Sequence, residues 1–169
     1  MKPNKAELYR EIRGRLAGAT GLAIMGVGYE LGSDDGAGLA AARRIQERLP
    51  HLPVFLTGSA PENYTGPVVK HRPSHVVFLD AAALDGDPGD VALIDPEQIK
   101  GVTFSTHTLP LATIMDYLSR SIGAKSFAIG IQPLHKGFGE EISAEVQRAA
   151  ELVGDVMVEV VEELNLTRQ

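Results

Sequence analysis

The chain has 169 residues, enough for one domain with a full hydrophobic core. It contains no cysteine, which excludes disulfides, thiolate metal sites and a cysteine nucleophile. The net charge of −6 leaves no general basic character for binding phosphates, so we expect no nucleic-acid partner. No apolar run approaches the about 18 residues that span a bilayer, and the charged N-terminus does not resemble a secretory signal. We therefore expect a cytoplasmic protein with no membrane association.

The apolar pattern predicts strands that alternate with helices. Five short apolar runs predict strands at 22–25, 54–56, 75–80, 91–94 and 125–131. Helical spacing of apolar residues predicts helices at 4–18, 36–49, 110–121 and 143–164, with Asn4 and Ser143 as N-caps. Residues 58–73 hold several prolines and glycines, so we expect a loop there with at most one helical turn.

Strands that are apolar on both faces and separated by helices are typical of the α/β class. We expect a three-layer domain in which a mostly parallel, twisted five-stranded sheet carries helices on both faces. In such folds, ligands and catalytic groups gather at the carboxyl ends of the strands. Polar residues that directly follow a strand are therefore the candidates for function.

Three positions stand out by this rule. Asp35 belongs to an acidic pair in the glycine-rich segment after the first strand, Asp80 ends the third strand, and His107 precedes a helix. Each also has an ordinary structural interpretation. The acidic pair Asp34 and Asp35 could cap a helix, Asp80 could be a hydrogen-bonded turn residue, and a lone histidine is more often structural than a ligand.

Two carboxylates and an imidazole suit a borderline divalent ion such as nickel or zinc. The three residues are far apart in sequence, so spacing alone does not prove that they converge. The carboxyl-end rule does place Asp35 and Asp80 at the same edge of the sheet.

Other chemistries have less support in the sequence. The glycine-rich segment lacks the third glycine of a dinucleotide loop, because position 31 is leucine, and its acidic pair would repel a pyrophosphate. No G-x-S-x-G elbow is present for Ser–His–Asp hydrolysis. The chain has no tryptophan for a sugar platform, which weakens a glycosidase interpretation.

Six segments, taken in order, resemble the maturation endopeptidases of nickel–iron hydrogenases, especially the type that serves the formate-hydrogenlyase hydrogenase. These segments are GVGYELGSDDGAG (26–38), APENYTGPV (60–68), RPSHVVFLDAA (72–82), FSTHTLPL (104–111), IGIQP (129–133) and FGEEISAEV (138–146). One departure is Gly28-Tyr29, where the family commonly has Gly-Asn, so the substrate-facing loop is expected to differ in detail.

The resemblance implies a peptidase that removes a C-terminal peptide from the nickel-loaded precursor of a hydrogenase large subunit. It implies that Asp35, Asp80 and His107 are both the catalytic and the metal-binding residues, with Asp35 chosen as the second member of the acidic pair. Nickel would be supplied by the substrate, and the protein would be a monomer.

The resemblance also implies one domain over residues 1–169, with a peptidase core at 21–166 and an added N-terminal helix at 1–18. Two alternatives remain open at this point. One is a non-catalytic, nickel-dependent binding or chaperone module for the precursor. The other is a nucleotide-binding domain of Rossmann type.

Overall fold

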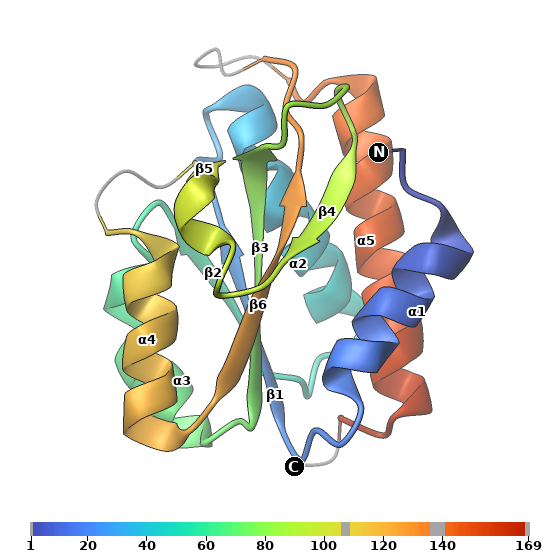
Figure 1. The fold of residues 1–169 in the computed structure, drawn as a ribbon. Helices are drawn as coiled ribbons and strands as arrows, with labels where there is room; N and C mark the ends of the chain where they lie inside the picture. Colours follow the sequence, from blue (N-terminus) through green and yellow to red (C-terminus); the bar gives the residue numbers. More distant parts are fainter. Residues whose placement is uncertain (1, 106–108, 136–140, 168–169) are drawn as a thin grey trace.

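The computed structural model describes residues 2–105, 109–135 and 141–167. Its centre is a six-stranded sheet with the order β2-β1-β3-β6-β4, and β5 pairs with the end of β3 (Figure 1). The strands are β1 (Leu22–Val27), β2 (Val54–Gly58), β3 (His75–Ala83), β4 (Val91–Ile94), β5 (Thr103–Phe104) and β6 (Lys125–Ile131). β2, β1, β3 and β6 are parallel, whereas β4 and β5 are antiparallel to their partners.

Helices cover both faces of this sheet, which confirms the predicted three-layer α/β class (Figure 1). The helices are α1 (Lys5–Leu16), α2 (Ala37–Arg48), α3 (Thr65–His71), α4 (Leu111–Ile122) and α5 (Ala144–Glu163), with short 3-10 turns η1 (Ser33–Gly36), η2 (Pro61–Tyr64) and η3 (Ile99–Gly101). α1, α2 and α5 contribute to one hydrophobic cluster, and α3 and α4 contribute to the other. No helix in the described ranges is both long enough and apolar enough to cross a bilayer.

α1 packs into the same layer as α2 and α5. Leu8, Ile12 and Leu16 recur at helical spacing, and all three are buried in the cluster that α5 also lines. Asn4 caps the helix as predicted, since its side-chain oxygen accepts a hydrogen bond from the N–H of Glu7 at 3.2 Å. The N-terminal segment is thus part of the core of the domain.

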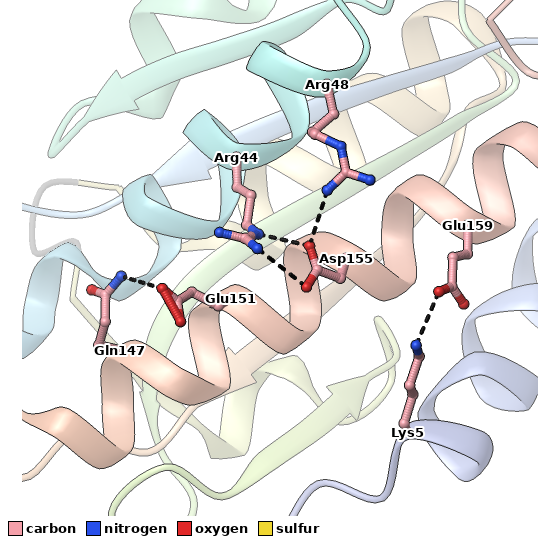
Figure 2. Close-up of polar contacts among 7 residues, drawn as sticks. All are labelled: Lys5, Arg44, Arg48, Gln147, Glu151, Asp155 and Glu159. Atoms are coloured by element: carbon pink, nitrogen blue, oxygen red, sulfur yellow. Dashed lines mark hydrogen bonds and ion pairs between the residues drawn. The ribbon is translucent and has the colours of Figure 1, made fainter.

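Ion pairs on the outer side of this layer connect its three helices (Figure 2). Asp155 on α5 accepts from Arg44 at 2.6 Å and from Arg48 at 3.3 Å, both on α2. Lys5 on α1 pairs with Glu159 on α5 at 3.0 Å. These are exposed pairs, so the buried apolar surface beneath them contributes most of the stability of the layer.

Two details differ from the sequence-based prediction. The five predicted strands are all present, but the two-residue strand β5 was not predicted, and β3 continues three residues past Asp80. The prediction of a loop at 58–73 was wrong in extent, because η2 and the seven-residue α3 lie there. Pro67 lies in the first turn of α3. Backbone N–H groups in the first turn of a helix have no partner within the helix, so proline is tolerated there.

Candidate active site

The glycines after β1 bring η1 and α2 onto the strand ends. A Cβ on Gly28, which has φ +147°, would lie 2.1 Å from the carbonyl oxygen of Asp35. A Cβ on Gly38 would lie 2.1 Å from the carbonyl oxygen of Leu79, so only glycine fits at either position. The groups that lie close to these glycines are backbone carbonyls of the protein itself, at Asp35 and Leu79. This accounts for the glycine pattern without a dinucleotide and weakens the nucleotide-binding alternative.

Asp34, the first acid of the pair, is a structural anchor. Its buried carboxylate accepts hydrogen bonds from the N–H groups of Leu134 and His135, both at 2.8 Å, and from the N–H and hydroxyl of Ser143, at 2.7 and 2.8 Å. Burial alone would raise the pKa of Asp34, but these donors bring it below its ordinary value. The charge also lies at the N-terminus of α5, where the helix dipole favours an anion.

Ser143 therefore has a different role from the predicted one. It occupies the N-cap position of α5, but its hydroxyl donates to Asp34, and the described structure gives it no side-chain bond to the helix it precedes. The result is a fixed connection between η1 and the segment that leads into α5. The hydroxyl of Ser33 strengthens this connection by donating to the carbonyl oxygen of Glu141 at 2.9 Å.

Asp80 lies on β3 and is completely buried. It accepts hydrogen bonds from the N–H of Ser105, at 3.2 Å, and from the Ser105 hydroxyl. The pairing of Ala82 with Phe104 on β5 positions Ser105 for this contact. Burial raises the pKa of Asp80 well above its ordinary range. The hydrogen bonds from Ser105 lower this pKa in part, and the negative charge of Asp35 raises it further.

The structure thus brings together two of the three predicted site residues. Asp35, on η1 after β1, and Asp80, on the neighbouring strand β3, lie within electrostatic reach of each other at the carboxyl ends of parallel strands. His107 lies outside the described residues. Over the ranges that the structure does describe, no group of three or more acidic or histidine side chains forms a metal cluster.

The negative charge of Asp35 disfavours ionised Asp80, and a cation at this edge would remove that penalty. A carboxylate has about four acceptor sites, and Asp80 uses three of them, for the N–H and hydroxyl of Ser105 and the N–H of Ala81. The donor set is therefore compatible with a divalent ion that accepts oxygen ligands.

Sequence reasoning missed the residues that hold these acids in place. Ser105 was not among the predicted site residues, and its hydrogen bonds to Asp80 depend on β5, which was not predicted. The amide oxygen of Gln132 accepts from the N–H of Leu84 at 2.6 Å and fixes the turn that follows β3. Ser105 did have one indication in the sequence, since it stands two positions before His107.

Comparison with known proteins gives the family. A family described as HycI, hydrogenase maturation protease, matches residues 39–162, a range that includes Asp80 and His107 and begins after Asp35. The hydrogenase 3 maturation protease of Escherichia coli K12 is 33% identical over 132 residues, which cover 77% of this chain and 84% of that protein.

Two solved structures agree with this result. The [NiFe] hydrogenase maturation protease HycI from Thermococcus kodakarensis KOD1 is 30% identical, with a TM-score of 0.83, over 90% of this chain and 99% of that one. The solution structure of the endopeptidase HycI from Escherichia coli is also 30% identical, with a TM-score of 0.73, over 85% of this chain and 92% of that one. The fold is that of the hydrogenase maturation proteases, which are peptide-bond hydrolases. The chain belongs to the hydrogenase maturation protease family, and its activity is that of an endopeptidase in hydrogenase maturation.

Proposed function

We propose that this chain removes a C-terminal peptide from the nickel-loaded precursor of a nickel–iron hydrogenase large subunit. We propose further that Asp35, Asp80 and His107 form the site that meets the nickel of the precursor. The observation that carries the proposal is the approach of Asp35 to the buried Asp80 at the carboxyl ends of β1 and β3.

The two acids supply a reason for dependence on the cation. Without a cation, burial and the neighbouring charge of Asp35 both disfavour ionised Asp80. A precursor that presents a divalent ion to this edge would favour the ionised form of Asp80. An apo precursor offers no such compensation, so the loaded precursor would bind preferentially.

His107 is proposed as the third ligand because imidazole and carboxylate together suit nickel. Ser105, two residues earlier in the chain, is hydrogen-bonded to Asp80, which supports a place for this segment at the site. The nickel carried by the precursor would polarise the peptide carbonyl for attack by water. The contribution of this chain is to hold ligand oxygens in place through Ser105 and the η1 backbone.

The experiment is to incubate the protein with nickel-loaded precursor and to follow loss of the C-terminal peptide by mass spectrometry. Asp35→Asn, Asp80→Asn and His107→Ala should each abolish cleavage while thermal unfolding stays near that of the unmodified protein. Asp87→Asn is the matched control, because Asp87 is an exposed acid in the turn before β4. The Asp87→Asn variant should cleave the precursor at the normal rate.

Two results would contradict the proposal. Near-normal cleavage by His107→Ala would remove His107 from the site. An unmodified protein that forms a stable complex with the loaded precursor but leaves it intact would favour the non-catalytic binding module.

A further inference from the structure

The first three residues of β6, 125–127, form an open edge of the sheet on the side of β4. β4 covers only the second half of β6, with pairs that run from Val91–Ile131 to Ile94–Ala128. A continued antiparallel register would bring Pro96 opposite Ser126, but proline has no N–H to donate, and the chain turns away there. Within the described ranges, no strand pairs with residues 125–127 on that side.

The backbone of Ser126 faces this open edge. The N–H of Gln132 donates towards β4, to the carbonyl oxygen of Asp90 at 2.8 Å, whereas the N–H of Lys125 donates the other way, to Ser74 at 2.9 Å. Because backbone groups alternate in direction along a strand, residues with even numbers in β6 face β4. The N–H and C=O of Ser126 are therefore placed for an added strand.

A groove of about 1000 Å³ lies along this edge, between the end of α1 on one side and α4 on the other. On the α1 side, the guanidinium of Arg15 lies 5.8 Å from the centre of the Phe127 ring and forms two bonds with Asp95, at 2.9 and 2.8 Å. Met115 on α4 and Ile99 on η3 supply apolar wall. The buried hydroxyl of Ser126 has no hydrogen-bond partner among the described residues.

The charge of the groove is opposite to that of the whole protein. Four cationic and three acidic side chains line the groove, while the chain as a whole carries −6. Arg15 is paired with Asp95, and Arg120 is paired with Asp116 at 2.9 Å. Lys100, Lys125 and the acidic Glu97 form no ion pair within the part of the chain that the structure describes, so the lining carries a net charge of +1. The groove is therefore suited to a ligand that carries acidic groups.

We propose that this groove binds an extended, acidic segment of the hydrogenase precursor as an added strand on β6. The inference rests on the proposed function and concerns a second contact with the same substrate. Ser126 stands four residues before Gly130, the partner of Asp80 in the sheet, or about 13 Å along the strand. One bound precursor can span both places, and backbone pairing would add affinity away from the bond that is cut.

The test measures the Kd of the nickel-loaded precursor for the Lys100→Glu/Lys125→Glu double variant. We expect the Kd to rise about tenfold, and the difference from the unmodified protein to shrink at high salt. KM for cleavage should rise with Kd while kcat stays unchanged, because neither lysine is near Asp80. Lys70→Glu on α3 is the matched control, since Lys70 is exposed and lies outside the groove.

Backbone pairing has its own readout. The Asp80→Asn variant leaves the precursor uncut, so it is studied at precursor concentrations that saturate it. The amide of Ser126 should then exchange more slowly with solvent deuterium than in the free variant. The inference would be overturned if the exchange of the Ser126 amide and the Kd of the double variant both stayed unchanged. Pro96 and Lys125 would then serve only to prevent the exposed edge from pairing with another strand. Because Kd does not require cleavage, this failure is distinct from failure of the proposed function.

Discussion

Gly28→Ala is expected to damage the active site through the backbone. The added Cβ would lie 2.1 Å from the carbonyl oxygen of Asp35, so that oxygen or the loop must move by about 1 Å to reach an ordinary contact. The φ of +147° adds backbone strain of about 1–3 kcal/mol for a residue with a side chain. Since Asp35 moves with its own backbone, its carboxylate leaves its place beside Asp80. A misplacement of about 1 Å can reduce a rate by about 100-fold.

The assay is kcat/KM for release of the C-terminal peptide, measured beside thermal unfolding. We expect a loss of about 100-fold in kcat/KM with a folded protein that unfolds at a somewhat lower temperature. Gly66→Ala is the control, because a Cβ there meets no atom within 4 Å and alanine suits the helix α3. Unimpaired cleavage by Gly28→Ala, with ordinary stability, would refute the argument that this glycine positions Asp35.

Three further predictions follow from the same structure. Asp34→Ala should lower the free energy of unfolding by about 2–4 kcal/mol in urea titrations, because four donors in a buried place lose their acceptor; a neutral result would refute the anchor. Arg44 lowers the pKa of Asp155 below its ordinary 3.8, so the pair stabilises the fold above that pH and the benefit disappears as pH falls through the lowered pKa. Asp155→Asn should thus cost less than about 1 kcal/mol in urea at pH 7 and progressively less as pH falls below 3.8, and a cost independent of pH would contradict the pairing. The protein purified without precursor should retain little nickel after dialysis, and stoichiometric nickel by elemental analysis would show a resident metal instead.

The sequence predicted the elements whose apolar residues repeat locally. The helices that became α1, α2, α4 and α5 were predicted to within a few residues, since each buries one side with helical spacing. β5 was missed because a strand of two residues is too short to show an alternation of apolar and polar residues, and because its pairing with β3 is a long-range contact. The antiparallel direction of β4 was equally out of reach, because an apolar run of four residues has no direction.

The site was predictable in outline for a similar reason. The rule on strand ends placed Asp35 and Asp80 at one edge, but the resemblance was needed to choose Asp35 over Asp34. The structural ground for that choice lies about 100 residues away, in the donors of Leu134 and Ser143. Local patterns around the acidic pair contain no trace of those partners.

Two adjacent carboxylates in η1 have opposite electrostatic relations to their surroundings. Asp34 accepts from four donors that lower its pKa, so its negative charge is stabilised within the protein. Asp35 acts on the buried Asp80, where its negative charge adds to the effect of burial and opposes ionisation of Asp80. In the second arrangement, a cation would lower the cost of ionising Asp80. On the proposed function, the nickel of the precursor supplies this cation, so the arrangement of Asp35 and Asp80 would favour a loaded substrate over an apo one.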